Sequence, residues 1–84
     1  MNLMESHAKI QTREDLAAFV AVLKQDLKKH PEEWENTELY SFLDAMQSWV
    51  EAMEWYYKNH DREMPESPTW QMIGDILMGA RIYE

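Results

Sequence analysis

The chain has 84 residues, enough for one domain with a single small core. Its composition, 45% hydrophobic and 12% aromatic, is too apolar for a disordered chain, and it has no cysteine for disulfides or thiolate metal sites. The net charge of -8 disfavours nucleic acid and anionic membrane surfaces as partners, but leaves a basic protein surface open. A simpler alternative is that the acidity only keeps the protein in solution.

The location of the protein is predicted from what the sequence lacks. No apolar run approaches the roughly 20 residues needed to cross a bilayer. The N-terminus has no basic region followed by an apolar stretch, the pattern of a secretory signal. Together with the absence of cysteine, these features lead us to expect a cytoplasmic protein without a membrane partner.

Residues 1–11 show no clear hydrophobic period and are predicted to form a flexible N-terminal arm. Ile10 is expected to pack near the start of the first helix. Residues 12–84 are predicted to form a single helical domain.

The first predicted helix follows Thr12, a good N-cap residue, with Asp15 three positions later as in a capping box. Its apolar residues recur at helical spacing: Leu16, Phe19, Val20, Leu23 and Leu27. Pro31 ends this helix and begins a short turn that is expected to place Trp34 in the core.

The second predicted helix begins at Asn36 as its N-cap and ends near Asn59, which tolerates a left-handed backbone conformation. At about 100° per residue, its large apolar side chains gather on one side. They are Leu39, Phe42, Leu43, Met46, Trp49, Val50, Met53, Tyr56 and Tyr57.

The third predicted helix is capped by Ser67 or Thr69, with Pro68 in the first turn. Its inward face is predicted to hold Trp70, Ile73, Ile76, Leu77 and Ala80. Apolar character extends around most of this helix, so that only Gln71, Asp75 and Gly79 form a polar strip. The residues that extend the apolar surface are Met72, Ile76, Met78, Ile82 and Tyr83. A helix that is apolar nearly all round needs cover on several sides, from the N-terminal arm or from a second subunit.

These patterns predict an all-α protein, a compact bundle of three main helices with a short extra helical turn near Pro31–Trp34. Five large side chains on the three inward faces are expected to be buried together. They are Phe19, Leu23, Phe42, Trp49 and Trp70.

A set of spaced residues also resembles a known family. The set is Trp34-Glu35-Asn36, Leu39, Phe42-Leu43, Trp49, Tyr56-Tyr57-x-Asn59, Pro65-x-x-Pro68-x-Trp70 and Tyr83-Glu84. The chain resembles, over roughly residues 10 to 84, a family of small acidic bacterial proteins described only as a domain of unknown function. The resemblance implies a self-contained bacterial domain and carries no activity, substrate or catalytic residue.

Catalysis has little support in the sequence. The three histidines, His7, His30 and His60, lie in separate segments, and none is paired at the i, i+4 spacing of a zinc site. Glu51 and Glu54 are better explained as a solvated helix face than as cation ligands. We therefore expect no enzyme, no cofactor and no metal site.

The remaining candidate site is the acidic side of the second helix. No lysine or arginine occurs between Lys29 and Lys58, a stretch with seven acidic residues. The face opposite the apolar stripe is expected to carry Tyr40, Asp44, Ser48, Glu51 and Trp55. An exposed tryptophan among acids resembles a binding hot spot for a basic surface, unless the N-terminal arm covers it or it is only a solvated apolar residue.

The leading interpretation is therefore a small non-catalytic protein-binding protein. Its role would be adaptor-like or inhibitory, the latter by analogy of size and acidity with bacterial immunity or antitoxin proteins. The alternative is a homodimeric structural module that associates through the third helix.

Overall fold

Helices make up the regular structure of this protein. The computed structural model describes residues 2–83, so Met1 and Glu84, the outer ends of the predicted arm and domain, lie outside it. The described residues form α1 (Leu3–Ala8), α2 (Arg13–Lys29), the 3-10 turn η1 (Pro31–Glu33), α3 (Leu39–Asn59) and α4 (Trp70–Ala80). They contain no strand, and the predicted all-α class with its extra turn after Pro31 is confirmed.

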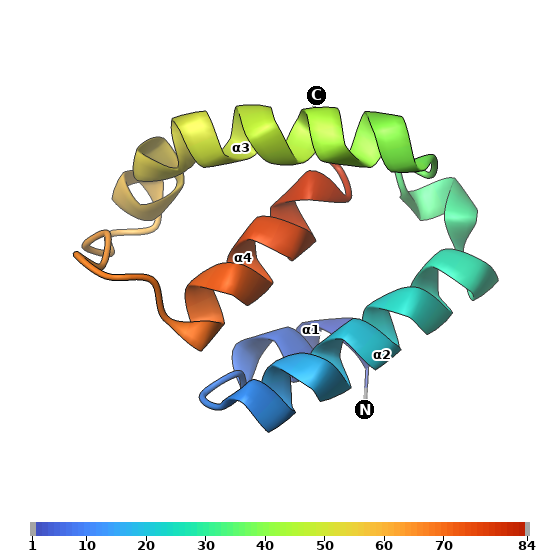
Figure 1. Ribbon diagram of the computed structural model, residues 1–84, viewed down its shortest axis with the longest axis horizontal. Coiled ribbons are helices and arrows are strands. Elements are labelled where there is room, and N and C mark those ends of the chain that lie inside the picture. Colours follow the sequence, from blue (N-terminus) through green and yellow to red (C-terminus); the bar gives the residue numbers. More distant parts are fainter. Residues whose placement is uncertain (1, 84) are drawn as a thin grey trace.

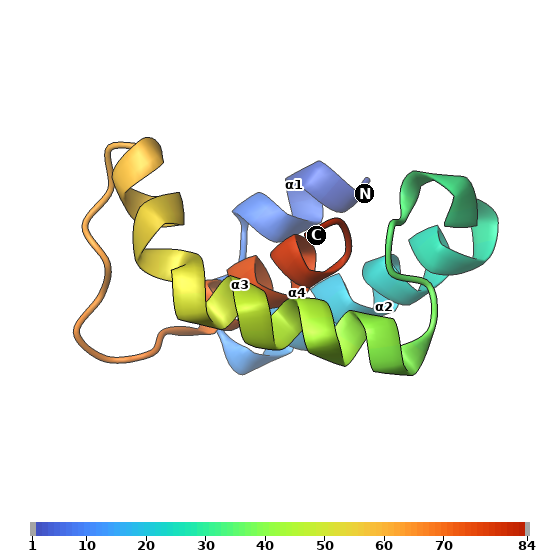
Figure 2. The same ribbon diagram turned by 90° about the horizontal axis from the view of Figure 1, so that it is seen from above.

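Helix α4 is the central element. It packs against α1, α2 and α3, and Figure 1 shows it between α3 on one side and the α1–α2 pair on the other. Helix α3, with 21 residues, packs against α4 rather than against α2. Seen from above, the loop of residues 60–69 leads in a wide arc from the end of α3 to the start of α4 (Figure 2). One side of α3 is therefore covered, and the opposite side is free.

Three of the predicted helix boundaries are confirmed. The side chain of Thr12 accepts a hydrogen bond from the backbone of Asp15, and that of Thr69 accepts one from the backbone of Met72. Pro31 follows the last turn of α2 and opens η1, which brings Trp34 into the core. The side chains of Thr12 and Thr69 satisfy backbone N–H groups that the first turn of a helix leaves free.

The predicted cap of the second helix is wrong. Helix α3 starts after Glu38, which makes no side-chain cap bond. The Asn36 side chain instead donates from Nδ2 to the backbone oxygens of Ala80 and Tyr83, at 3.0 and 2.8 Å. Carbonyl groups at the C-terminal end of a helix have no partner within the helix, and the Asn36 side chain supplies a donor for them. It joins the loop after η1 to the C-terminal end of α4.

The core consists of two clusters rather than one. The first is built around Ile10, Phe19, Leu23 and Trp34, and the second around Trp49, Met53, Tyr57 and Met72. Burial of Phe19, Leu23 and Trp49 is confirmed, but Phe42 is only partly buried against the first cluster. The predicted burial of the five residues together is therefore wrong, because Trp49 lies in the second cluster, Phe42 is only partly buried and Trp70 is exposed.

Trp70 also lies outside the predicted core. It occupies the first position of α4 and is 42% exposed, whereas Met72 is buried in the second cluster. At 100° per residue these two side chains point about 200° apart. The inward face of α4 is thus rotated from the predicted one, because α1 covers the side that carries Asp75.

The apolar stripe of α3 is wider than the surface that α4 covers. Leu39, Leu43 and Val50 were expected on the core side, but they are exposed, Leu39 to 73%. Only one helix packs along α3, and a single neighbour covers a narrow part of a helix surface. Exposed apolar side chains therefore border the acidic side of α3.

Helix α1 lies in the segment for which the sequence predicted no regular structure. Asn2 caps it by accepting a hydrogen bond from the backbone of Glu5 at 2.8 Å, and it packs on α2 and α4. Six residues are too few to show a hydrophobic period, so the sequence pattern could not reveal this helix. The expected packing of Ile10 is confirmed, and its side chain lies against Gly74.

Candidate functional site

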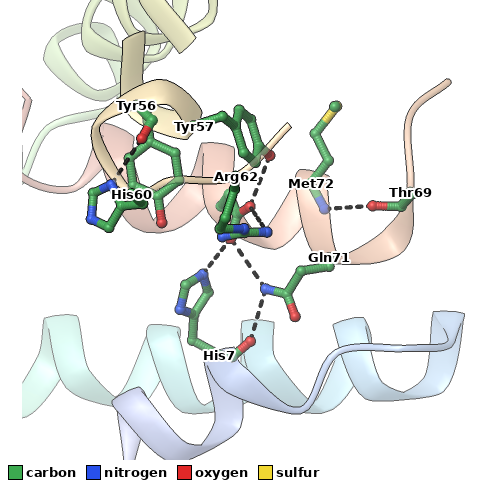
Figure 3. Close-up of polar contacts among 9 residues, drawn as sticks. His7, Tyr56, Tyr57, His60, Arg62, Thr69, Gln71 and Met72 are labelled. Atoms are coloured by element: carbon green, nitrogen blue, oxygen red, sulfur yellow. Dashed lines mark hydrogen bonds and ion pairs between the residues drawn. The ribbon is translucent and has the colours of Figure 1, made fainter. Parts of the chain in front are cut away.

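A buried carboxylate on α4 organises a polar cluster where α1, α3 and α4 meet. The Asp75 side chain is inaccessible to solvent, and its Oδ1 lies 2.7 Å from His7 Nε2. Tyr57 donates to Oδ2 at 2.8 Å, and Gln71 donates to Oδ1 at 3.1 Å. Arg62 Nη2 lies 3.8 Å from Oδ2, and Figure 3 shows these four side chains converging. Buried charges are tolerated when they are paired in this way.

The C-terminal end of α3 places Arg62 in this cluster. Asp61 adopts a left-handed conformation with φ of 52°, and Arg62 N–H donates to the Tyr57 carbonyl at 2.8 Å. This is the Schellman arrangement, which turns the chain back over the helix end. It brings the Arg62 guanidinium to 5.0 Å from the centre of the Tyr57 ring. The predicted end of the helix near Asn59 is confirmed, but the left-handed residue is Asp61 rather than Asn59.

Helix α1 is held to α4 by the same cluster. Gln71 Nε2 donates to the backbone oxygen of His7 at 3.0 Å as well as to Asp75. His7 is therefore fixed through both its side chain and its backbone. Its ring also lies 5.6 Å from the ring of Phe19 on α2. A histidine expected in a flexible arm is thus a structural partner of the buried acid.

The surroundings of Asp75 shift its ionisation. Burial alone raises the pKa of a carboxyl group, but the hydrogen bonds from His7, Tyr57 and Gln71 outweigh it and lower the pKa of Asp75 below its ordinary value. Burial raises the pKa of the Tyr57 phenol, and its hydrogen bond to the Asp75 carboxylate raises it further. The fold therefore favours an ionised Asp75 beside a neutral Tyr57.

A pocket of about 420 Å³ opens beside this cluster. Its lining comes from α1, α3, α4 and the segment that follows α4: His7, Trp49, Tyr56, Asp75, Met78, Gly79, Ile82 and Tyr83. The lining combines aromatic and aliphatic side chains with the polar residues His7 and Asp75, as small-molecule sites commonly do.

The predicted acidic face lies on the free side of α3. Tyr40 and Trp55 are 83% and 63% exposed, and Asp44 and Glu51 are exposed between them. Ser48 is partly buried and marks the edge of this face. The structure thus brings these five residues onto one side of a helix, as the sequence indicated. Trp55 is not covered by the N-terminal segment, since α1 packs on α2 and α4.

The described part of the chain offers neither a metal-binding cluster nor a membrane-spanning helix. Residues 2–83 contain no group of three or more histidine, aspartate or glutamate side chains placed to hold a metal ion. None of the helices in this range combines the length and apolar character needed to cross a bilayer.

Comparison with protein families matches residues 12–84 to a family of unknown function, DUF7660. The chain belongs to this family. The match confirms the resemblance to a domain of unknown function, and it begins at the N-cap of α2. No curated protein and no solved structure matches the chain. Helix α1, which carries His7, lies outside the part matched to DUF7660.

The buried cluster is the part of this DUF7660 chain that sequence reasoning missed. The sequence places Asp75 in a polar strip with Gln71 and Gly79, and His7 in a flexible arm. One signal for it was present: a single acid in the middle of a helix that is otherwise apolar nearly all round. Such an acid is better explained by a buried partner than by solvent, although the sequence does not reveal that the partner is His7.

The apolar circumference of α4, which suggested a homodimer of this DUF7660 chain, has a different explanation. Helices α1, α2 and α3 surround α4 within the same chain, and Met78 is partly buried. Ile82, which follows the helix, is 49% exposed. Association through this helix stays a prediction.

Proposed function

We propose that this chain is a small non-catalytic protein-binding protein whose free α3 face contacts a basic surface on its partner. The observation that supports this most is the composition of that face. Asp44, Glu51 and Glu54 are exposed between the exposed aromatic residues Tyr40 and Trp55. Basic surfaces attract such a face over a distance, and aromatic side chains supply the contact energy.

The dimensions of the face suit a helix-mediated interface. Tyr40 and Trp55 lie about 22 Å apart along the helix, at 1.5 Å per residue. Leu43 and Val50 are exposed along one edge and add apolar surface between the two aromatic residues. Exposed apolar residues that are contiguous and bordered by charge are typical of protein interaction sites. The face therefore has both the apolar anchors and the acidic surroundings of such a site.

Charge favours a basic partner over a second copy of the chain. Two copies would each carry a net charge of -8, and their acidic faces would repel one another. A basic partner would instead gain from the same charges. An inhibitory role, in which the rigid helix masks a functional basic surface, is the specific form of the proposal that small size and acidity favour.

The test uses two double variants with the same changes of residue type. Trp55→Ala/Glu51→Lys alters the α3 face, and Trp70→Ala/Glu14→Lys makes matched changes on α4 and α2. All four positions are exposed, so both variants should stay folded. Wild type and both variants are used to capture proteins from a lysate of the native host, at low and at high salt.

The proposal predicts a basic protein that wild type and the matched control retain at low salt and that the α3 variant loses. Truncation of a central aromatic anchor costs at least about 2 kcal/mol of binding free energy. Retention should fall with added salt, because salt screens exposed charges. Equal capture by both folded variants, or a mass of two chains in sedimentation with no other partner, would contradict it.

A further inference from the structure

The pocket beside Asp75 has the dimensions of a small-molecule site. Its volume of about 420 Å³ falls within the range of roughly 300–1,000 Å³ typical of ligand pockets. Three separate helices and the segment after α4 contribute to its lining, so its shape depends on the tertiary fold. Ile82 lines the pocket and is 49% exposed, so the pocket opens to solvent beside this residue. Trp55 does not line it, which separates the pocket from the α3 face.

Three large aromatic side chains line this pocket: Trp49, Tyr56 and Tyr83. The rings of Trp49 and Tyr56 lie 5.2 Å apart and are inclined at 52°, so they form two walls at an angle rather than one flat stack. Tyr83 adds a third ring from the segment after α4. The face of an aromatic ring is electron-rich and attracts cations, and several rings around one pocket are typical of sites for quaternary ammonium groups.

The two rings from α3 are held in place by their neighbours. A side-chain carbon at position 79 would fall on the Trp49 indole, at its Nε1, Cδ1 and Cε2 atoms, so Gly79 lets the indole lie directly on α4. The Tyr56 ring lies 5.2 Å from the Tyr57 ring and 4.4 Å from the His60 ring. Walls that are fixed before a ligand arrives lower the entropy cost of binding.

The charge of the lining favours a cation. Among the described residues that line the pocket, Asp75 is the acid, and none is a lysine or an arginine. Asp75 is ionised, since its hydrogen-bond partners lower its pKa. Arg62 lies 3.8 Å from Oδ2, but it is outside the lining, and its side chain is 45% exposed, so that water screens its charge. His7 adds a positive charge to the lining only when it is protonated. The net charge of -8 also attracts cations to the molecule as a whole.

The hydrogen bonds of Asp75 decide between kinds of cation. Its side chain is inaccessible to solvent, and its two oxygens already lie within hydrogen-bond distance of His7, Tyr57 and Gln71. A primary ammonium group has three N–H donors that need acceptors, and this carboxylate offers none that is free. A quaternary ammonium group has no N–H donor, so it can use the charge of Asp75 without a hydrogen bond.

We propose that this pocket binds a quaternary ammonium group among the rings of Trp49, Tyr56 and Tyr83. The buried charge of Asp75 attracts the group, and Met78 and Ile82 contact its methyl groups. Such groups occur in small molecules such as choline and in trimethylated lysine side chains. The site is distinct from the α3 face and does not depend on the protein-binding proposal.

The test follows the indole N–H signals of the four tryptophans in two-dimensional NMR spectra while choline is added. The proposal predicts a saturable shift of the Trp49 signal at millimolar concentrations. The Trp34 signal serves as an internal control, since its N–H is bonded to Asp26 in the first cluster. 3,3-Dimethyl-1-butanol, which has the shape of choline without the charge, should bind about tenfold more weakly. Ethanolamine, a primary ammonium, should also bind more weakly than choline.

Two pairs of variants locate the site. Ile82→Glu should tighten choline binding and Ile82→Lys should weaken it, each about fivefold, while the neutral alcohol changes little. Tyr83→Leu removes one ring and should weaken choline binding, whereas Tyr40→Leu makes the same change at an exposed position of α3 and should not. The hydrogen bonds of Tyr83 to Gly79 and Asn36 involve only its backbone, so Tyr83→Leu should stay folded.

The same titration with an acetylated trimethyllysine amide distinguishes the two sources of the ligand. Tighter binding of choline would indicate a free small molecule, and tighter binding of the amide would indicate a modified lysine side chain. A Trp49 signal that shifts with neither compound would overturn the proposal. So would equal affinity for choline and its neutral analogue, stronger binding of benzoate than of choline, or equal choline affinity in the two Ile82 variants.

Discussion

Tyr57 on α3 donates a hydrogen bond of 2.8 Å to Asp75 on α4, and both residues are buried. This bond connects two helices whose sequences do not reveal which polar residues pair. Because Asp75 also binds His7 on α1, the same carboxylate joins three of the four helices. The cluster therefore determines how α1, α3 and α4 are oriented around the core.

Removal of the Tyr57 hydroxyl tests this role. Tyr57→Phe keeps the ring in the core but deprives the charged Asp75 of a donor. We expect it to lower the free energy of unfolding by about 1.5–3 kcal/mol, the usual contribution of a hydrogen bond to a charged group. Tyr40→Phe removes the same atom at an exposed position and should change stability little. Urea denaturation of the two variants makes the comparison, and equal midpoints would show that the bond is not stabilising.

The lowered pKa of Asp75 predicts a specific loss of stability in acid. A carboxyl group whose pKa is lower in the folded state stabilises the fold above its unfolded pKa, about 3.9 for aspartate. This contribution disappears as the pH falls below that value and through the folded pKa. Wild type should thus lose stability more steeply than Asp75→Asn below about pH 4. Parallel curves for the two proteins in denaturation measurements from pH 6 to pH 2 would argue against an ionised buried Asp75.

The two glycines of α4 should respond oppositely to the same substitution. At Gly79, the alanine methyl group would meet the rigid Trp49 indole, and overpacking of this kind typically costs about 1–3 kcal/mol. At Gly74, it would meet the Cδ1 atom of Ile10, the end of a flexible side chain. Gly74→Ala also gains up to about 1 kcal/mol of helix propensity. Thermal unfolding should therefore show Gly79→Ala to be clearly the less stable, and the reverse order would contradict the packing described for Trp49.

Two tryptophans allow a similar comparison of core and surface. Trp49→Ala should lower the free energy of unfolding by about 3–5 kcal/mol, since it leaves a large cavity in the second cluster. Trp70→Ala should cost much less, because Trp70 is exposed at the start of α4. Chemical denaturation gives both values. An unchanged midpoint for Trp49→Ala would exclude its place in the core.

Local sequence patterns predicted the fold where neighbouring residues determine the structure. Thr12, Pro31 and Thr69 act on the backbone within a few positions of themselves, and their effects were predicted correctly. Asn36 and Trp70 were misplaced because their environments depend on distant parts of the chain. Asn36 has a local preference for capping, but the free carbonyls at the end of α4 compete for its side chain.

The candidate sites divide in the same way. Helical periodicity alone places Tyr40 and Trp55 on one exposed side of α3, so this face could be predicted. The pocket and the polar cluster depend on contacts such as His7 with Asp75, which are 68 positions apart in the sequence. No local pattern encodes that pairing. The rotation of α4 that buries Asp75 follows from the docking of α1, a helix too short to be recognised from its hydrophobic period.

The NMR signals of the tryptophan indoles report whether a protein partner binds at the α3 face. The protein partner retained in the capture experiment is added to the labelled chain, and the four indole N–H signals are followed. We predict that the Trp55 signal and the backbone signals of Tyr40, Asp44 and Glu51 change most. Changes centred on Trp34, Trp49 or Trp70, with Trp55 unaffected, would contradict it.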